Sequence, residues 1–362
     1  MTVTTGMIGQ GFYNRNSAPQ WAATEAILPW LDDAVARISR IDPPETIGIA
    51  DFGCSEGRNS SEVMHRLVST LRAGGARPIM TIQSDLPTND FTALLESLRA
   101  DGRSVFGDNV YSAVIGGSMF DQLLPPRSIH LATTFNAIGF LSRRPLDDLP
   151  GYILPNGPSA ARGVGKVSEA ERAAFAAQAA ADIESFLRAR AAELTAGGQL
   201  LIEVFGASQT TRACDGIYDV LNDALLEALS DGVIDRPRYE TYYQPVYFRT
   251  LEELVAPVSG PESALSSLFD LDRAETYEVA VPFVEAYRAT GDTCAYARAY
   301  TDFFRAFTEA PLRMAFPGDE PAAIAHDIYG RCERLIRENP GRYPFRYVSV
   351  AALLTRREDE AQ

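Results

Sequence analysis

A turn that contains two glycines, set between an apolar segment and a helical one, constrains the fold more than any other feature. Residues 46–52 form a short apolar run, and residues 60–71 repeat apolar side chains at helical spacing. The turn between them holds Gly53 and Gly57, where a backbone can approach a ligand that a Cβ would block. A helix that begins after such a turn offers unpaired N–H groups. The segment therefore predicts a strand–turn–helix unit that binds a ligand.

Strand and helix patterns alternate through the first part of the chain, which predicts a parallel sheet covered on both faces. We therefore expect an α/β fold, a Rossmann-like core with a helical cap over the site. The core is predicted over residues 1–145, 169–207 and 326–362, and the cap over residues 146–168 and 208–325. Further helices are predicted at 20–40 (kinked at Pro29), 90–100 (N-cap Asp90) and 170–194 (C-cap Gly197-Gly198). Further strands are predicted at 78–83, 110–116, 129–135, 199–205 and 346–354, and residues 146–168 are predicted to form a loop.

Composition excludes several classes of protein. The 48 acidic and 33 basic residues give a net charge of −15, which does not suit binding along a phosphate backbone, so no nucleic-acid partner is expected. The 4 cysteines lie far apart and only 3 histidines exist, so we expect no structural zinc and a reducing, cytoplasmic location. No apolar run approaches the roughly 20 residues that span a bilayer.

The turn itself suggests which ligand it binds. Its pattern D-x-G-x-x-x-G begins with Asp51 and differs from the G-x-G-x-x-G pattern that cradles a pyrophosphate. An acidic residue there suits a cofactor with an ammonium and a sulfonium group, which describes S-adenosylmethionine. Asp85 ends the next predicted strand, where a carboxylate can hold a ribose diol. Because glycine-rich turns are common, an ordinary strand–helix turn remains the alternative on this pattern alone.

Several motifs follow one another in register along the chain. They are Y-x-x-N-S-x-x-Q at 13–20, A-D-F-G-C-S-x-G-x-N at 50–59, S-D-L-P-T-N-D-F at 84–91, G-S-M-F at 117–120, L-L-P at 123–125 and S-I-H at 128–130. Together they resemble the SABATH family of S-adenosylmethionine-dependent methyltransferases, over residues 7 to 335. Most members methylate small carboxylic acids such as salicylate, jasmonate and indole-3-acetate. Bacterial relatives include fatty acid O-methyltransferases.

The resemblance implies the residues that contact the cofactor. Asp51 would lie near the methionine part, Asp85 would hold the ribose, and Leu86 and Met119 would enclose the adenine. Plain packing is the alternative for each residue, but unpaired buried carboxylates are costly. The full implied set is Ser17, Asp51, Gly53, Asn59, Asp85, Leu86, Ser118 and Met119, with Tyr13, Cys54, Thr134 and Phe135 as further candidates.

The substrate side departs from the family pattern. Gln20 is kept, and the resemblance implies that it bonds the substrate carboxylate. The plant-type segment S-S-Y-S-L-H-W-L-S aligns with residues 134–142, so tyrosine becomes Asn136, histidine becomes Gly139 and tryptophan becomes Phe140. We expect Gly139 to free volume for a longer apolar substrate, and Gln20 and Asn136 to act as the catalytic pair by donating N–H groups to the carboxylate. A medium-chain fatty acid is the predicted substrate.

No catalytic base is needed for this reaction. A carboxylic acid with a pKa of about 4.3, like that of glutamate, is ionised at pH 7, and its carboxylate is itself the nucleophile. Positioning of the reacting atoms can contribute about 7–11 kcal/mol. His130 lies within a strand pattern and is predicted to be structural.

Other functions remain open. The residue at the metal-binding asparagine position of some family members is Tyr243, so no Mg²⁺ is expected. One alternative is methyl ester formation on an aromatic acid, and another is C-methylation of a prenyl diphosphate held by Arg143, Arg144 and Arg162. A third is a binder that has lost catalysis. Family resemblance implies a homodimer, and the use of arginine in place of lysine, with Lys166 as the only lysine, suggests a bacterial source.

Overall fold

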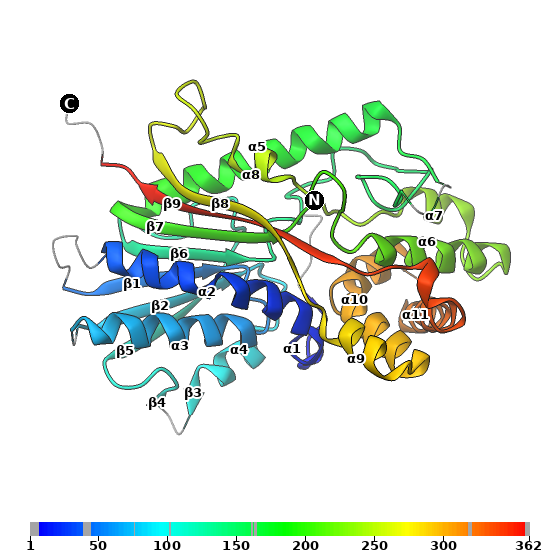
Figure 1. Ribbon diagram of the computed structural model, residues 1–362, viewed down its shortest axis with the longest axis horizontal. Helices are drawn as coiled ribbons and strands as arrows, with labels where there is room; N and C mark the ends of the chain where they lie inside the picture. Colours follow the sequence, from blue (N-terminus) through cyan, green and yellow to red (C-terminus); the bar gives the residue numbers. More distant parts are fainter. Residues whose placement is uncertain are drawn as a thin grey trace.

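A seven-stranded mixed sheet forms the centre of one half of the molecule (Figure 1). The computed structural model describes residues 7–38, 45–75, 77–100, 103–160, 162, 165–317 and 321–358. The strand order is β5-β2-β1-β6-β7-β9-β8, in which β9 is antiparallel to both of its neighbours and the other neighbouring strands are parallel. The strands are β1 (Ile47–Phe52), β2 (Ile79–Asp85), β5 (Val110–Gly116), β6 (Ile129–Phe135), β7 (Leu194–Phe205), β8 (Phe269–Val279) and β9 (Tyr347–Arg356).

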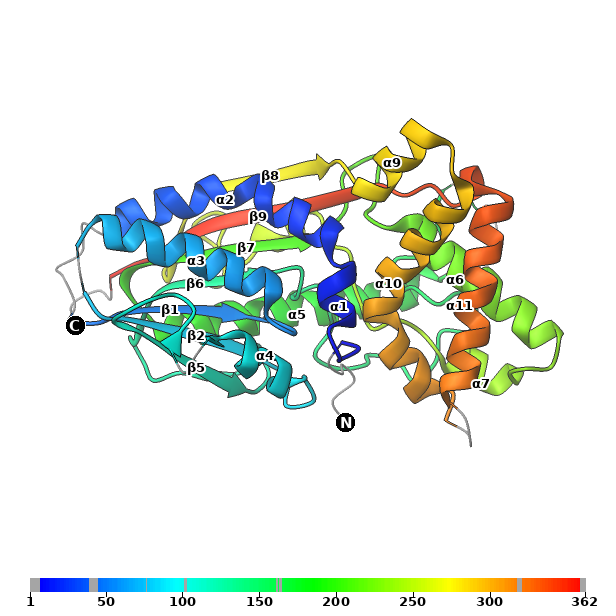
Figure 2. The ribbon, with the colours of Figure 1, turned by 90° about the horizontal axis from the view of Figure 1, so that it is seen from below.

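Helices cover both faces of the sheet, as the apolar strands require (Figure 2). On one face, α2 (Ala18–Ile38) and α3 (Arg58–Ala73) pack against side chains such as Ile49 of β1. On the other face, α5 (Glu169–Glu193) and α8 (Leu251–Val255) pack against the alternate residues, including Phe52. The smaller elements nearby are α4 (Phe91–Ser97), β3 (Arg99–Ala100) and β4 (Arg103–Ser104).

A second group of helices lies at the carboxyl end of the parallel strands (Figures 1 and 2). Its core is rich in aromatic residues, among them Tyr300, Phe303 and Phe345, whose rings contact one another. Short helix α1 contacts α10 and so lies between the two halves. The helices are α1 (Phe12–Asn16), α6 (Asp215–Ser230), α7 (Arg236–Thr241), α9 (Pro282–Thr290), α10 (Thr293–Ala315), α11 (Pro321–Glu338) and the 3₁₀ turn η1 (Pro340–Arg342).

The predicted α/β architecture is confirmed, with differences at particular elements. The segment 208–325, predicted to be helical, contains β8, an edge strand paired with β9. Helix α11 packs on α6 and α10, so most of 326–338 lies with the cap helices and not with the core. The helix predicted at 170–194 ends at Glu193 and β7 begins at once, so Gly197-Gly198 lies within the strand and is not a C-cap. The helix predicted at 90–100 ends at Ser97, although Asp90 does cap it by accepting a bond from Ala93 N.

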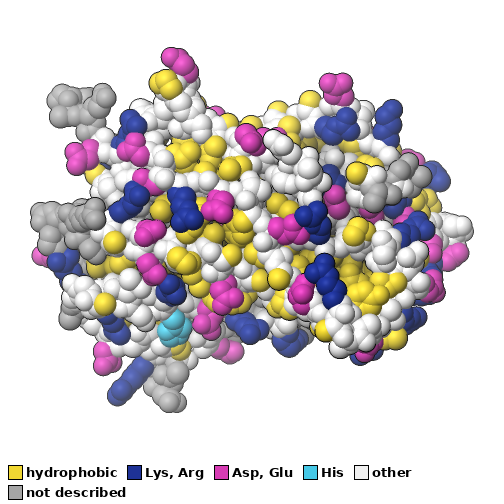
Figure 3. Space-filling model, in the orientation of Figure 1, with side chains coloured by type: hydrophobic (Ala, Val, Ile, Leu, Met, Phe, Trp, Pro, Cys, Tyr) yellow, Lys and Arg dark blue, Asp and Glu magenta, His cyan; other side chains and the backbone are white. Residues whose placement is uncertain are grey.

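The surface carries charges of both signs. On the face shown in Figure 3, basic and acidic side chains are interspersed and form no large patch of one sign. Many of the arginines pair with neighbouring carboxylates, as Arg66 does with Asp32 and Arg357 with Asp270. Among the helices described, none is both long enough and apolar enough to cross a bilayer.

Candidate active site

The turn after β1 forms the floor of a cavity. Gly53 has a φ of +89°, and a Cβ at this position would lie 2.3 Å from the Ala137 Cβ and 3.0 Å from the Met119 Cε. The Gly53 and Cys54 amides both donate to the Ser84 carbonyl, at 2.8 and 3.1 Å, which folds the turn against the end of β2. Only glycine fits at residue 53, and the bare backbone there faces the space above the sheet.

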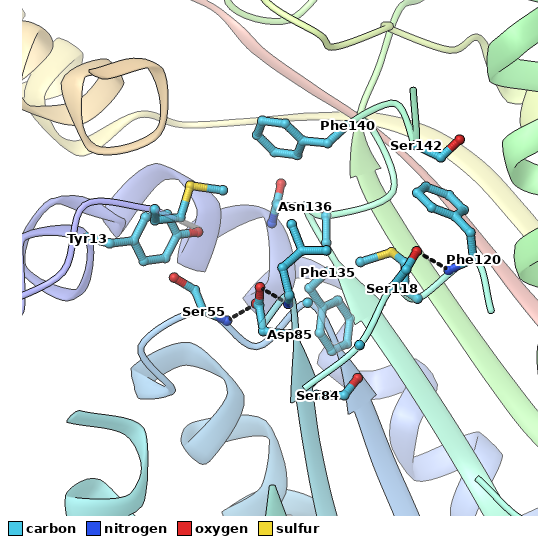
Figure 4. Close-up of a pocket in the computed structure, with 16 residues that line it drawn as sticks. Tyr13, Ser55, Ser84, Asp85, Ser118, Phe120, Phe135, Asn136, Phe140 and Ser142 are labelled. Atoms are coloured by element: carbon cyan, nitrogen blue, oxygen red, sulfur yellow. Dashed lines mark hydrogen bonds between the residues drawn. The ribbon is translucent and has the colours of Figure 1, made fainter. Parts of the chain in front are cut away.

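This first cavity lies at the carboxyl ends of the parallel strands and contains about 760 Å³ of space between protein atoms, open solvent included (Figure 4). Most of the predicted cofactor residues line it, and they come from several different strand ends. Those residues are Tyr13, Gly53, Asp85, Leu86, Ser118, Met119 and Phe135; Asn136 and Phe140, predicted for the substrate, line it too. Its other lining residues are Met7, Ser55, Ser84, Gly117, Phe120, Ala137 and Ser142.

Asp85 is the central acidic group of the first cavity. Its carboxylate accepts the Ser55 N–H at 2.6 Å and the Leu86 N–H at 2.7 Å, as drawn in Figure 4. Burial raises the pKa of Asp85 to about 6, and the two backbone bonds oppose that rise. Each oxygen keeps a lone pair, so the carboxylate can still accept hydroxyl groups from a ligand.

Five of the residues predicted to bind the cofactor do not line the first cavity. Asp51 is buried, accepts the Thr133 hydroxyl at 2.7 Å, and has a pKa raised by burial. Cys54 and Thr134 are also buried near the strand ends without lining the cavity. Ser17 and Asn59 do come together, with the Asn59 amide 3.4 Å from the Ser17 hydroxyl, but they line a separate groove.

Glu56 holds the N-terminal segment onto this site, and the sequence analysis missed it. Its carboxylate accepts the Gly11 N–H at 2.6 Å and the Asn14 N–H at 3.1 Å. These bonds fix α1 above the turn and place the Tyr13 side chain at the cavity. The sequence shows only an acidic residue at a position where the 50–59 motif allows any residue, and its burial becomes visible only in the structure.

A second cavity of about 360 Å³ extends from the first into the helical half. Met7, Tyr13, Asn136 and Phe140 line both cavities, and we call these four residues the junction. Beyond the junction, the lining is mostly aromatic and carries no charged side chain among the described residues. It consists of Gln20, Phe205, Cys214, Tyr218, Phe248, Phe303, Phe307 and Tyr347.

The two predicted substrate donors differ in their surroundings. Gln20 is buried and lines the second cavity; its amide oxygen Oε1, which can only accept, has no partner within the described chain, and the donating amide nitrogen makes no hydrogen bond there either. Asn136, in contrast, donates its amide to Glu203 at 2.8 Å and accepts the Tyr347 hydroxyl at 2.6 Å. The prediction that Asn136 donates to a carboxylate is therefore not supported, because its side chain is bonded within the protein.

Gly139 does not free volume for a substrate, which corrects the sequence expectation. It lines neither cavity, and a Cβ at this position would lie 2.3 Å from the ring of Phe205. Phe205 thus occupies the space above Gly139 and itself lines the second cavity. Phe140 does line both cavities, as a predicted substrate contact should.

The remaining residues considered in the sequence analysis, one histidine and three arginines, interact with other parts of the protein. His130 accepts the Gly48 N–H at 3.1 Å, which agrees with a structural role. Arg143 bonds Gln178, Arg144 stacks over Tyr243, and Arg162 pairs with Asp223. None of these arginines lines either cavity, and no other lysine or arginine among the described residues does so, which leaves a diphosphate without a described cationic partner there. Across the described ranges, no group of three or more His, Cys, Asp or Glu side chains is arranged to hold a metal ion.

Comparisons with known proteins agree with this geometry. A family model described as "SAM dependent carboxyl methyltransferase" matches residues 2–357. The probable jasmonic acid carboxyl methyltransferase 1 of Theobroma cacao is 25% identical over 96% of each chain. The indole-3-acetate O-methyltransferase 1 of Oryza sativa subsp. japonica is 27% identical over 81% of this chain and 80% of that protein. A solved structure of loganic acid methyltransferase with SAH has a TM-score of 0.80 at 20% identity, covering 99% of this chain and 100% of that one, and so shares the fold.

Proposed function

We infer, since this chain belongs to the family of S-adenosylmethionine-dependent carboxyl methyltransferases, that it forms methyl esters of small apolar acids at the junction of its two cavities. The observation that carries this proposal is the junction itself. A cavity at the strand ends that contains Asp85 and an uncharged, mostly aromatic cavity among the helices share Met7, Tyr13, Asn136 and Phe140. A cofactor in the first cavity and an acid in the second would therefore meet at these residues.

The first cavity fits S-adenosylmethionine. Asp85 would accept the ribose hydroxyls with its remaining lone pairs, and Leu86 and Met119 would contact the adenine. The close approach of backbone at Gly53 would admit the methionine part, with Asp51 buried beneath the turn as the negative charge nearest its ammonium. When bound, this cofactor supplies a methyl group on a sulfonium, which is an activated electrophile.

The protein's own groups then orient and desolvate the acid. Gln20 would donate its amide N–H to one carboxylate oxygen, and the other oxygen would face the junction. The aromatic lining excludes water, which strengthens the effect of the negative charge on the bound acid. Holding the reacting atoms in line can contribute about 7–11 kcal/mol without a general base. Gln20 is thus the side chain that we propose to orient the substrate.

A medium-chain fatty acid is the substrate that we propose within this class. The second cavity is apolar and uncharged, so it suits a neutral hydrocarbon tail behind a single carboxylate. An aromatic acid is the second candidate, because Phe140, Phe205 and Phe248 present ring faces and edges to the cavity. We also propose a homodimer in a bacterial cytoplasm, on the grounds of family resemblance and the use of arginine in place of lysine.

Product analysis tests the proposal. The protein is incubated with S-adenosylmethionine and a pool of medium-chain fatty acids, benzoate, indole-3-acetate and geranyl diphosphate, with and without Mg²⁺. We expect fatty acyl methyl esters without metal, and far less ester from Gln20→Leu, which keeps the side-chain size but loses the amide. An aromatic ester alone would replace the proposed acid by the second candidate. Methylated geranyl diphosphate, or no product, would contradict carboxyl methylation.

A further inference from the structure

A hydroxyl group in the second cavity has no hydrogen-bond partner. Tyr218 is 2% exposed and lines this cavity, and its phenol oxygen bonds to no residue of the described chain. Several other buried phenols have partners, as Tyr239 bonds Asn222 and Tyr347 bonds Asn136. A buried hydroxyl without a partner is unfavourable, and such groups in native structures usually face a water or a ligand.

Two intervening rings separate Tyr218 from the junction residue Phe140. A run of ring contacts leads to Tyr218 from Phe140, which lines both cavities. Centroid distances are 6.0 Å from Phe140 to Phe205, 5.0 Å from Phe205 to Phe248 and 5.7 Å from Phe248 to Tyr218. An acid with its carboxylate at the junction would therefore extend along these rings and bring its far end to the Tyr218 hydroxyl.

The helix that carries Tyr218 is held in place. Cys214 and Tyr218 are four residues apart at the start of α6 and both line the cavity, so this face of the helix points inward. Gly216 faces the opposite way, and a Cβ there would lie 2.5 Å from the Pro344 carbonyl oxygen and 2.6 Å from the Tyr300 hydroxyl. Such close packing keeps the start of α6, and with it the phenol, fixed against the cavity.

The side chains around Tyr218 limit the kinds of ligand that can bind at this part of the cavity. A phenol both donates and accepts a hydrogen bond, so it suits a hydroxyl or a keto oxygen. No charged side chain lines the cavity within the described ranges, so a second carboxylate would be buried without a counter-ion. A plain hydrocarbon end would leave the Tyr218 hydroxyl unpaired.

We propose that the acid bound here carries a hydroxyl or keto oxygen near the end opposite its carboxylate, and that Tyr218 binds this oxygen. The inference rests on the proposed carboxyl methylation and makes its substrate more specific, from an apolar acid to an oxygenated one. Tyr218 is in this account the residue that selects the substrate, while Gln20 orients the carboxylate.

Paired substrates test the inference. Octanoate and decanoate are compared with their derivatives that carry a hydroxyl group on the last carbon, or a hydroxyl or keto group on the last-but-one carbon. The wild-type protein should show a kcat/KM about 10- to 100-fold higher for the best oxygenated acid than for the plain acid. In Tyr218→Phe this ratio should fall close to one, with the plain acid converted at least as well as before.

Tyr300→Phe is the matched control. Its hydroxyl makes no hydrogen bond to any described residue and is fully buried, but Tyr300 does not line the second cavity. This variant removes the same atom from a neighbouring site and should keep the wild-type ratio. Equal kcat/KM for plain and oxygenated acids in the wild type, or a ratio unchanged in Tyr218→Phe, would overturn the inference.

Calorimetry separates this inference from the proposed function. Binding of the same acids is measured on the protein saturated with S-adenosylhomocysteine, where no methyl transfer can occur. Tighter binding of oxygenated acids, lost in Tyr218→Phe, supports the inference even if no ester forms, a result that would contradict only the proposed reaction. Ester formation without any preference contradicts only the inference. If no acid binds and no ester forms, both the inference and the proposed function are contradicted.

Discussion

The two cavities differ in how the chain builds them. The first cavity consists of strand ends and short turns, and its key contacts come from the backbone: Gly53, and the amides of Ser55 and Leu86 on Asp85. The second cavity is made of side chains from α2, β7, α6, α10 and β9, which meet only in the folded protein. Local motifs therefore determine the proposed cofactor site, whereas tertiary packing determines the proposed acid site. One family can thus keep one cofactor while its acids vary.

Among the variants that distinguish the two cavities, a substitution at Gly53 should have the largest effect on ligand binding. In Gly53→Ala the new methyl would contact the Ala137 Cβ at 2.3 Å, so we expect the rise in Tm on adding S-adenosylhomocysteine to be lost. Gly260→Ala is the control, because φ at Gly260 is +93°, close to the +89° of Gly53, and nothing lies within 4 Å. Both variants lose about 1–2 kcal/mol of stability through the left-handed backbone, but only Gly53→Ala should lose ligand binding.

Asp85→Asn tests the polar character of the first cavity. Asparagine keeps the size but replaces one acceptor oxygen with a donor, which faces either the Ser55 or the Leu86 N–H. We expect cofactor affinity, measured by calorimetry, to fall about 10- to 100-fold, because hydrogen bonds to a charged group contribute about 1.5–3 kcal/mol. An unchanged Kd would remove the ribose assignment.

Glu203 beside the second cavity should make stability depend on pH. Burial raises its pKa from 4.5 to about 8, so the folded protein favours the protonated acid. The stabilisation from the protonated acid is fully present below pH 4.5 and is lost as pH rises through about 8; its size is on the order of 5 kcal/mol. Urea unfolding across this window should show a flatter pH dependence in Glu203→Gln than in the wild type. The exposed Glu262→Gln should match the wild type, and equal slopes in all three proteins would contradict the assignment.

Gly139→Ala should disturb the second cavity and leave the first intact. The added Cβ would lie 2.3 Å from the ring of Phe205, and such overpacking destabilises by about 1–3 kcal/mol. Phe205→Leu in the same protein should restore most of that stability, since it removes the ring that the Cβ meets. Cofactor affinity should stay at the wild-type value in each variant. Failure of the double variant to recover would show that Phe205 does not fill this space.

The smallest effect is expected at Ser17. Its hydroxyl lies beside the Asn59 amide and lines a groove separate from the first cavity. Ser17→Ala should change the cofactor Kd by less than about threefold, since only a weak neutral hydrogen bond is lost. A loss as large as that of Asp85→Asn would place Ser17 at the cofactor after all.

The difference between a cavity built by local motifs and one built by tertiary packing also explains which residues the sequence could predict. Gly53, Asp85 and Met119 were predictable because each stands in a short motif at a strand end, and strand ends of a parallel sheet meet at one edge. Strand β8 was not predictable, because it alternates exposed charged residues with half-buried ones and therefore does not resemble a buried strand. Local patterns find turns and buried strands, and they miss edge strands.

The second cavity lay beyond sequence reasoning for a different reason. Asn136 looked free for a substrate, but its partners Glu203 and Tyr347 are 67 and 211 residues away in the chain. Gly139 suggested empty space, but Phe205 fills it from β7. In both cases the missing information was a contact between distant segments, which no local pattern contains.

A crystal structure with S-adenosylhomocysteine and a medium-chain acid would test the central claim most directly. We predict the homocysteine sulfur in the first cavity and the carboxylate at the junction beside Gln20, with the hydrocarbon chain along Phe205 and Phe248 toward Tyr218. An acid bound outside the second cavity, or one with its carboxylate turned toward Tyr218 and away from the sulfur, would contradict methyl transfer at the junction.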